Sequence, residues 1–568
     1  MKLNPNRAEL LLYGAHLVDP ASHDPKGDSI AISGGRILAT GWKEQLTTLC
    51  SPETRYIDCT GLTLLPGLID GHAHLDREGL KSVLPSISGA RSIVEIQRIL
   101  GEVVKATPPG EWIVLSPLGT PPLFKDGWSK LAEGRCPNRH DLDMVAPDNP
   151  VWIRPIWGYW SNQPDLVSVA NTAALELAGI GRTTEPPHPL VTIHRDATGL
   201  PDGRFHERTR VSIVEMTLMS AAPGFDVTTR SKAMDVSMRT YARYGTTGIY
   251  EGHGVAEEVI EAYGNLQRRG TGCLRATLVV SPKWSTAGDD TDMKEMILDW
   301  TAWAKRGLDE SDLLRVEGIY AEIDETDEGI LRASAAPCTG WAGFHLDCGG
   351  KPALVRELLL EAARQGLRVS TIFDDVMTLM GEVDRIHPLA GLGWVRGHVA
   401  TLDDAAIGAI GDMGLTLVTH TNRHIAKAGS AHLARLGRGR AQEIVPIRRL
   451  LDAGIPIALG SDNLPPSLLH PIADLELRRD HSTGETIAPD QAITRREALA
   501  LATTGGAALL GHAADLGHLK AGYLADLAGF PTDILSIPAE ELRHLEAKLT
   551  LVGGKVLRQP NAKRDDGS

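Results

Sequence analysis

The stretch LLPGLIDGHAHLDR, residues 64–77, places two histidines one residue apart at the end of an apolar run. Residues i and i+2 of a strand project from the same face, so His72 and His74 are expected to point in the same direction. The apolar residues before them are typical of a strand that is buried on both faces. Two imidazoles at the end of such a strand indicate a metal site, and the alternative is a pair of hydrogen-bonded structural histidines.

A helical stretch, a glycine and a short apolar run follow one another repeatedly, as in residues 361–373 (EAARQGLRVSTIF) and 450–462 (LLDAGIPIALGSD). The glycine is expected to cap the helix, and the apolar run is typical of a buried strand. Strands are thus predicted at residues 63–70, 246–251, 274–280, 314–322, 367–373, 393–398, 415–420 and 457–461. Eight parallel strands that alternate with helices predict an α/β fold, a TIM-like (β/α)8 barrel.

Other segments interrupt and flank the predicted barrel, residues 63–515. The long gap between the first and second strands predicts an insertion at residues 80–240, with strand-like segments and Pro/Gly-rich turns. The β segments within residues 1–62 and 516–558 predict a small β domain built from both termini. The polar residues 559–568 are expected to form a disordered tail.

The composition narrows the classes of partner. The formal net charge is −14 and no dense Lys/Arg run occurs, whereas binding to nucleic acids or anionic membranes needs clustered positive charge. We therefore expect a small-molecule substrate, and neither nucleic acid nor a membrane. The N-terminus lacks a secretory pattern, no apolar stretch could span a bilayer, and the cysteines form no Cys-x-x-Cys pair. These features predict a cytoplasmic protein.

Two more candidates stand where barrel strands are predicted to end, which is the catalytic rim of this fold. Asp462 follows the eighth strand, and His398 ends the sixth. The Asp462 carboxylate can bind a metal ion and accept a proton, although Ser-Asp is also a turn and helix N-cap signal. For His398 we expect a role in catalysis, either in polarising the substrate or contacting the ligands, or equally in ligating the metal directly, and the alternative is a structural histidine.

Four segments in chain order resemble the signature of the amidohydrolase superfamily. They are LPGLIDGHAH (65–74), RGHVATLDD (396–404), IPIALGSDNLPP (455–466) and GHLKAGYLADLAGF (517–530). The segments VSVANTAALELAGI (167–180) and RDATGLPDGRFHE (195–207) are similar to the insertion of a large branch that includes N-substituted formamide deformylases. The resemblance implies a metal-dependent hydrolase that cleaves carbon–nitrogen bonds other than peptide bonds, with Asp462 as the residue that accepts the proton of the attacking water.

The chain departs from this branch at two ligand positions. Tyr320 stands where the branch has a lysine that bridges two metals, and Thr371 stands where it has a histidine. We therefore expect one metal ion, held by His72, His74 and Asp462, because a catalytic zinc needs only three protein ligands. Zinc is the expected metal, although iron and manganese suit the same ligands. Substitute ligands, or residues that contact the ligands, are expected among Tyr320, Glu322, His345, Thr371 and His420.

Aromatic residues concentrate in VWIRPIWGYW (151–160). Trp157, Tyr159 and Trp160 are candidates to stack on a flat substrate, and the alternative is that they belong to the core. The leading hypothesis is a hydrolase that uses metal-activated water on an amide or formamide of a small molecule. The alternatives are an aminoheterocycle deaminase, or a catalytically silent homologue that binds a ligand or acts as a scaffold. A homodimer is the usual assembly in the superfamily that this chain resembles.

Overall fold

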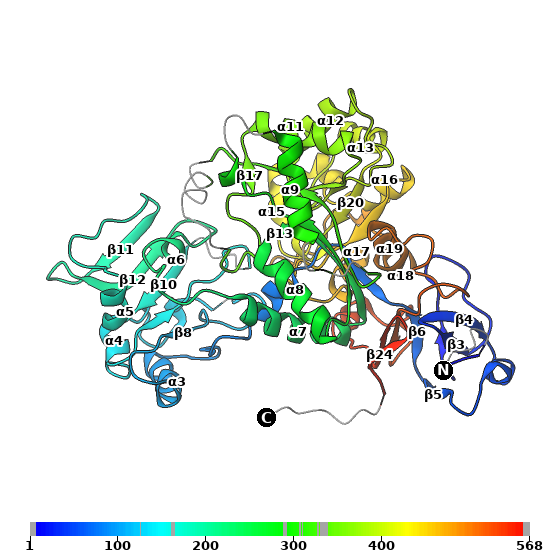
Figure 1. Ribbon diagram of the computed structural model, residues 1–568, viewed down its shortest axis with the longest axis horizontal. Helices are drawn as coiled ribbons and strands as arrows, with labels where there is room; N and C mark the ends of the chain where they lie inside the picture. The colour runs from blue at the N-terminus through cyan, green and yellow to red at the C-terminus, as the bar shows by residue number, and fades with distance from the viewer. Residues whose placement is uncertain are drawn as a thin grey trace.

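The computed structural model describes residues 7–560, except for residues 125, 161–164, 288–291, 306–307, 309–310, 327–328 and 330–338. Most of the predicted tail, residues 561–568, lies outside the described residues. Figure 1 shows the insertion and the terminal strands on opposite sides of a central body of strands and helices. No helix in the described part of the chain is long and apolar enough to cross a membrane.

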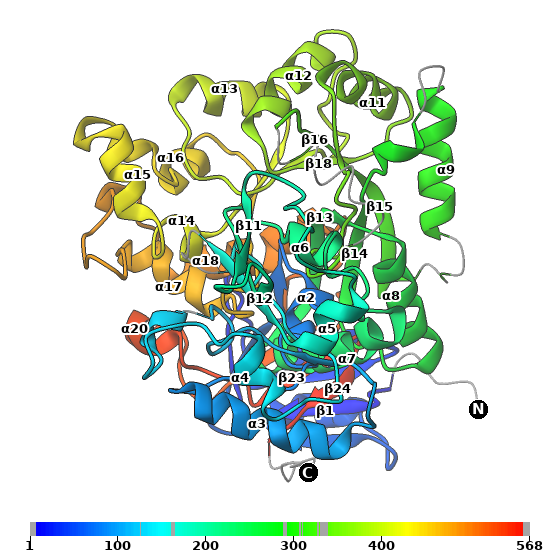
Figure 2. The ribbon, with the colours of Figure 1, turned by 90° about the vertical axis from the view of Figure 1, so that its left-hand side faces the viewer.

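An eight-stranded parallel sheet forms this centre, as the sequence predicts. Its strands are hydrogen-bonded in the order β7 (Leu68–Asp70), β13 (Thr246–Val255), β14 (Arg275–Val280), β15 (Leu314–Tyr320), β18 (Val369–Thr371), β19 (Val395–Arg396), β20 (Thr416–Thr419) and β21 (Ile457–Leu459). Each strand overlaps one of the eight predicted ranges. Figure 2 shows helices α8, α9 and α11 to α17 arranged around these strands, which is the barrel architecture.

More than one helix accompanies several of the barrel strands, and many of these helices are short. They are α2 (Leu75–Leu80), α7 (Val227–Arg243), α8 (Glu257–Arg269), α9 (Met293–Lys305), α11 (Pro352–Arg364), α12 (Asp374–Asp384), α13 (Asp404–Asp412), α14 (Thr421–His424), α15 (Gly429–Leu436), α16 (Ile447–Asp452), α17 (Leu469–Leu477), α18 (Arg495–Ala500) and α19 (Gly506–Leu509). Helix α8 ends at Gly270 in the left-handed conformation (φ 67°), which is the glycine cap that the repeated pattern predicts.

The predicted first strand, residues 63–70, is in fact two strands in two different sheets. The first, β6 (Thr63–Pro66), pairs with β2 (His16–Leu17) and with the C-terminal strand β22 (Leu527–Phe530), and only β7 enters the barrel. The chain turns at Gly67, where a Cβ atom would lie 2.1 Å from the Thr247 hydroxyl oxygen. A continuous apolar run cannot reveal this division, because both halves are buried.

Backbone hydrogen bonds connect the two end strands, β7 and β21, and the residues that follow them, and so close the barrel. The backbone N–H of Gly71 donates to the carbonyl of Leu459 at 2.7 Å, and that of Asp462 donates to the carbonyl of His72 at 3.0 Å. The carboxylate of Asp70 accepts from the backbone N–H groups of His72 and Ser461, at 3.1 and 2.9 Å. The two segments that carry the predicted metal ligands are therefore joined directly.

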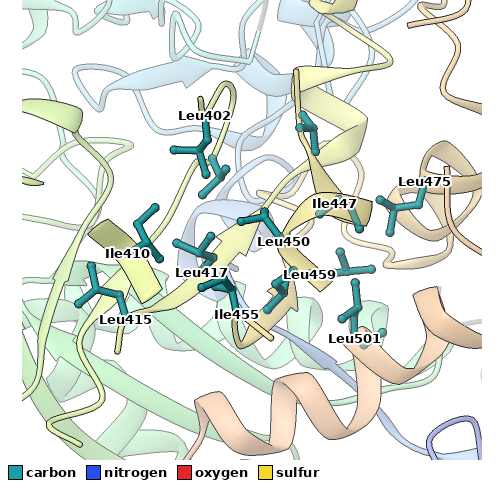
Figure 3. Close-up of a cluster of buried hydrophobic side chains, with 14 of the residues drawn as sticks. Leu402, Ile410, Leu415, Leu417, Ile447, Leu450, Ile455, Leu459, Leu475 and Leu501 are labelled. Atoms are coloured by element: carbon teal, nitrogen blue, oxygen red, sulfur yellow. The ribbon is translucent and has the colours of Figure 1, made fainter. Parts of the chain in front are cut away.

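The barrel core follows the two-residue period of its strands. In β21, Ala458 packs inside the barrel, while Ile457 and Leu459 pack outward against the helices. Figure 3 shows this outer layer, in which leucine and isoleucine side chains of α13, α16 and α17 meet Leu417 of β20 and Leu459. The outward residues fix the helices around the barrel, and the ends of the strands remain available for a site.

Strands from both ends of the chain lie next to the barrel. One sheet has the order β4 (Arg36–Gly41), β3 (Ser29–Ser33), β1 (Leu10–Tyr13) and β5 (Arg55–Asp58). The other sheet combines β2 and β6 with β22, β23 (Leu549–Val552) and β24 (Lys555–Arg558). N-terminal and C-terminal segments thus share one sheet, and the boundaries of a separate small domain stay a prediction.

The segment between β7 and β13 carries a sheet of its own. Its strands have the order β11 (Val191–Arg195), β12 (Pro201–Glu207), β10 (Leu166–Ala170), β9 (Val151–Ile153) and β8 (Ile113–Leu115). The helices that accompany it are α3 (Ile93–Ala106), α4 (Arg139–Asp143), α5 (Thr172–Leu177) and α6 (Ile213–Met216). Residues after β9 return toward the barrel and carry the aromatic cluster of the sequence.

Candidate metal centre and its cavity

The side chains of His72, His74 and Asp462 converge at the C-terminal ends of β7 and β21. One ligand atom from each lies within 4.8 Å of the others, and all three residues are buried. His74 Nε2 lies 3.5 Å and His72 Nε2 lies 4.0 Å from Asp462 Oδ1. Atoms about 2.1 Å from one ion at tetrahedral angles are roughly 3.4 Å apart, so these separations suit a shared metal ion.

The free nitrogen of His74 supports the same fit. His74 Nε2 is buried and makes no well-directed hydrogen bond among the described residues, and the Asp462 carboxylate lies 3.5 Å from it. Leaving such an atom unpaired costs about 1–3 kcal/mol, and a bound ion would remove that cost. The donor set of two imidazoles and one carboxylate is common for zinc. The residues present therefore fit a divalent metal ion.

Glu251 orients His74, a role that the sequence alone does not reveal. Its Oε2 atom lies 3.1 Å from His74 Nδ1, while Oε1 accepts from the Leu75 backbone N–H and the Tyr263 hydroxyl, each at 2.9 Å. A carboxylate on Nδ1 fixes the ring and directs Nε2 toward a metal ion. Glu251 lies on β13, which pairs with β7. In the sequence, only the predicted neighbourhood of these two strands could have pointed to a contact between Glu251 and His74.

The loop after β21 is held against the loop after β7 by Asn463. Its side-chain oxygen accepts from the His74 backbone N–H at 2.9 Å, and its side-chain nitrogen donates to the His74 carbonyl at 2.7 Å. Asp462 and Asn463 have φ of 51° and 60°, and His398 has φ of 52°. Such left-handed conformations are costly outside glycine and are concentrated at functional sites. They direct Asp462 and His398 into the same space.

His398 lies beside the predicted ligands, and its side chain is partly exposed to solvent. Its Nε2 lies 3.3 Å from His72 Nε2 and 3.9 Å from Asp462 Oδ2. Burial, together with the neighbouring imidazole of His420, holds the pKa of His398 well below its usual value, and the same two causes act on His72. Both rings are therefore neutral near pH 7, which is the form that can ligate a metal ion.

Arg423 and the histidines keep Asp462 ionised. Arg423 Nη1 donates to Asp462 Oδ2 at 2.7 Å. Burial would raise the pKa of Asp462, but the contact with His74 and the charge of the Arg423 guanidinium outweigh it and hold the pKa well below its usual range. Asp462 is thus a carboxylate that can serve as a ligand and accept a proton when the charges around it change.

The other predicted ligands divide into two groups. Tyr320 and Glu322 lie on the site side of β15 and β16 (Glu322–Ile323). The Tyr320 ring is 4.8 Å from that of His253, and Glu322 Oε2 is 3.9 Å from His253 Nε2. Burial, reinforced by Glu322, raises the pKa of Tyr320 well above its usual value, so the phenol stays protonated.

Thr371 and His345 make contacts outside the ligand cluster. The Thr371 hydroxyl accepts from the Phe373 backbone N–H at 3.3 Å. His345 Nδ1 lies 3.0 Å from the Ser281 carbonyl, and its Nε2 contacts the Glu257 carboxylate. Both nitrogens of His345 therefore already have partners. The remaining candidate, His420, follows β20, and its ring lies 4.8 Å from that of His72 and 4.3 Å from that of His398.

A cavity of about 470 Å³ opens above this cluster. His398 and Asp462 line it together with residues from the insertion, from β16 and from the loop after β18; the aromatic members are Trp157, Tyr159, Trp160, Phe344 and Phe373. The Trp157 ring lies 5.4 Å from that of Tyr159. Trp157 and Trp160 are also buried against the core, so they both line the cavity and belong to the core. Tyr159 is 38% exposed.

Barrel, convergent ligands and cavity together define a metal-dependent hydrolase of the amidohydrolase type. The model of the amidohydrolase family, Amidohydro_3, matches residues 55–558, and the chain belongs to this family. The chain is 25% identical to an N-substituted formamide deformylase of Arthrobacter pascens, over 97% of this chain and 98% of that protein. The superfamily and branch that the sequence motifs indicate are thus confirmed.

Solved structures show the same fold at lower sequence identity. An uncharacterized metal-dependent hydrolase from Pyrococcus horikoshii OT3 superposes with a TM-score of 0.66 at 18% identity, over 94% of this chain and 99% of that chain. Its counterpart from Pyrococcus furiosus superposes with a TM-score of 0.65 at 18% identity, over 93% and 100%. At this identity the likeness establishes the barrel fold.

Proposed function

We propose that the protein is a metal-dependent hydrolase that cleaves a non-peptide carbon–nitrogen bond, of the amide or formamide type, in a small molecule. The observation that carries this proposal is the convergence of His72, His74 and Asp462 at the inner end of a cavity lined by aromatic rings. The similarity to a protein named N-substituted formamide deformylase supports the choice of bond.

One divalent ion, preferably zinc, would be held by His72, His74 and Asp462. Iron and manganese suit the same donors. When bound, such an ion lowers the pKa of water and polarises a carbonyl group. A second ion has less support, since Tyr320 remains a protonated phenol and Thr371 is engaged by the backbone.

The side chains of this chain would then divide the proton transfers. Asp462 accepts a proton from the attacking water as the water oxygen bonds to the carbonyl carbon. The same carboxyl group returns that proton to the nitrogen as the carbon–nitrogen bond breaks, which yields an amine and a carboxylic acid. His398, one of the two histidines among the described residues that line the cavity, is placed to stabilise the developing negative charge on the oxygen.

Trp157, Tyr159 and Trp160 would contact the group attached to the nitrogen. Their rings form one wall of the cavity that also contains His398 and Asp462. Flat aromatic or heterocyclic groups suit such a wall, because rings stack favourably at centroid distances of about 4.5–7 Å. The same wall would accept an aminoheterocycle, which keeps a deaminase as the second candidate.

The setting that we propose is the cytoplasm. Within the described residues, Cys50, Cys59, Cys136, Cys273 and Cys348 form no disulfide, as expected under reducing conditions. A homodimer is proposed from the habit of the superfamily, and analytical ultracentrifugation would test it.

Metal analysis and a substrate panel test the proposed function. Protein purified without chelators is expected to hold about one zinc, iron or manganese ion per chain and to release amines from N-substituted formamides or amides. The Asp462→Asn variant should lose about 10²- to 10⁴-fold in kcat. Release of ammonia from aminoheterocycles alone would favour the deaminase. A protein without metal and without turnover would be a silent homologue.

A further inference from the structure

His420 is a buried histidine beside the candidate metal centre. It follows β20, and its side chain has no solvent exposure. Within the described part of the chain, neither of its ring nitrogens has a hydrogen-bond partner. A polar group buried in this way costs about 1–3 kcal/mol. A structural histidine would be expected to have avoided that cost, as His345 does with Ser281 and Glu257.

The neighbours of His420 are the residues of the candidate metal centre. The His420 ring lies edge-on to that of His72, with centroids 4.8 Å apart. One ligand atom each of His72, His398 and His420 lies within 4.8 Å of the others. His72 therefore belongs to two overlapping groups of ligand atoms, one with His74 and Asp462 and one with His398 and His420.

His398 and His420 differ in what they can reach. His398 lines the cavity, so its ring is open to a substrate, whereas His420 is not among the described residues that line the cavity and is fully buried beside His398. A histidine in that position has no access to substrate. The hydroxyl of Thr371, on β18, accepts a hydrogen bond from the Phe373 backbone N–H.

The absence of a side chain at Gly460 provides the space that the His420 ring occupies. A Cβ atom at Gly460 would lie 2.6 Å from His420 Nε2 and 2.8 Å from the Cβ atom of His72. Both distances are shorter than real contacts allow. Any side chain at Gly460, in the loop between β21 and Asp462, would therefore separate the two imidazoles.

We propose that His420 is a further ligand of the metal ion held by His72, His74 and Asp462. This proposal rests on the proposed function, because it assumes that the centre binds a metal ion. It assigns the fourth protein donor to the seventh barrel strand and leaves His398 free to act on the substrate. The ligand set would then be three imidazoles and one carboxylate.

Metal affinity tests this assignment without any measurement of turnover. Metal-free wild-type protein, His420→Asn and His424→Asn are titrated with Zn²⁺ against a chelator of known affinity. His424 is the matched control, since it is also buried and its ring lies 6.2 Å from that of His420, but it belongs to neither group of ligand atoms. Loss of an outer contact of a ligand costs about 10- to 100-fold in affinity, so loss of a ligand should exceed 100-fold.

A second variant tests the contact directly. His420→Cys and His424→Cys are loaded with Co²⁺, and their near-ultraviolet absorption is recorded. A thiolate bound to Co²⁺ adds a sulfur-to-metal charge-transfer band, which is expected for His420→Cys alone. This measurement also decides the question if His420→Asn does not fold.

The outcomes separate the two proposals. Wild-type affinity in His420→Asn, or equal losses in His420→Asn and His424→Asn, would overturn the role of His420. Absence of the charge-transfer band in cobalt-loaded His420→Cys would overturn it as well. In each of these cases wild-type protein still binds metal and the proposed function stands. If wild-type protein itself binds no Zn²⁺, the proposed function fails first.

Discussion

The His74–Glu251 and His345–Glu257 pairs are built in opposite ways, although both histidines are buried. His74 contacts Glu251 through Nδ1 and leaves Nε2 beside Asp462 and His72. His345 contacts the Ser281 carbonyl through Nδ1 and Glu257 through Nε2. The first histidine leaves one nitrogen without a well-directed hydrogen bond, where the proposed metal ion would bind, and both nitrogens of the second have partners. A nearby carboxylate is therefore not enough to mark a histidine as a candidate metal ligand. The histidine also needs a second ring nitrogen that no hydrogen bond occupies.

Protonation of the imidazole has different consequences for His74 and for His345. Burial lowers the pKa of each ring, but the adjacent carboxylates outweigh burial and raise both pKa values. In His345 both nitrogens face acceptors, so the protonated form is satisfied and stable. In His74 a metal ion would replace the proton on Nε2, so metal binding there should release a proton and weaken as the pH falls.

The strongest test of the comparison removes the two histidines of the first strand. The His72→Ala/His74→Ala double variant should lose bound metal and all measurable turnover, because only Asp462 would remain of the three predicted ligands. His345→Ala is the control and should keep both properties. Metal content by mass spectrometry and kcat/KM check the prediction, and a metal-loaded, active double variant would refute it.

The carboxylate that orients His74 gives the next largest effect. Glu251→Gln should lower metal affinity by about 10- to 100-fold, since the neutral amide is a weaker acceptor for the His74 Nδ1 proton. Glu257→Gln makes the equivalent change at the His345 pair and should leave metal affinity as in wild type. Competitive Zn²⁺ titration measures both, and equal effects in the two variants would contradict the distinction.

The cavity wall is expected to contribute less. Tyr159→Ala should raise KM for an aromatic N-substituted formamide by about 2- to 10-fold, because stacked rings contribute about 0.5–1.5 kcal/mol. The change in kcat should be smaller. Tyr56→Ala is a suitable control, since Tyr56 is 45% exposed and lies on β5 of a terminal sheet. An unchanged KM for Tyr159→Ala would place the substrate elsewhere in the cavity.

The smallest effect is a pH-dependent loss of stability in His345→Asn. The hydrogen bond with His345 lowers the pKa of Glu257 to about 2, so its contribution is present above pH 4.5 and is lost as the pH falls toward 2. The raised pKa of His345 gives a contribution that is present below pH 6.5 and is lost as the pH rises through the folded-state pKa. Both act together between pH 4.5 and 6.5.

Thermal unfolding at several pH values measures this effect. The destabilisation by His345→Asn should be largest between pH 4.5 and 6.5 and smaller at pH 9. Glu257 is 40% exposed, so the loss should be about 1 kcal/mol or less. A constant difference in Tm across this range would show that packing, and not the ion pair, accounts for the role of His345.

Much of the fold follows from local sequence patterns. The spacing of apolar runs and glycines predicts all eight barrel strands, because strands buried on both faces are continuous and apolar. The same pattern predicts a single strand over Thr63–Pro66 and Leu68–Asp70. These are two strands in two sheets, and the sequence cannot separate them because both are buried and only their hydrogen-bond partners differ. The ends of strands, where His72, His74, His398 and Asp462 stand, could be read from the sequence.

The sequence by itself determined the family, the barrel and the residues at the rim, because these depend on periodicity and on motifs within single segments. Only the tertiary structure decided which histidines keep a free nitrogen. Glu251 meets His74 across 177 residues, and Arg423 meets Asp462 across 39. His345, which stands among several candidate ligands in the sequence, is turned toward Glu257 instead. Hydrogen-bond direction is a property of the folded neighbourhood, and residue type and spacing do not contain it.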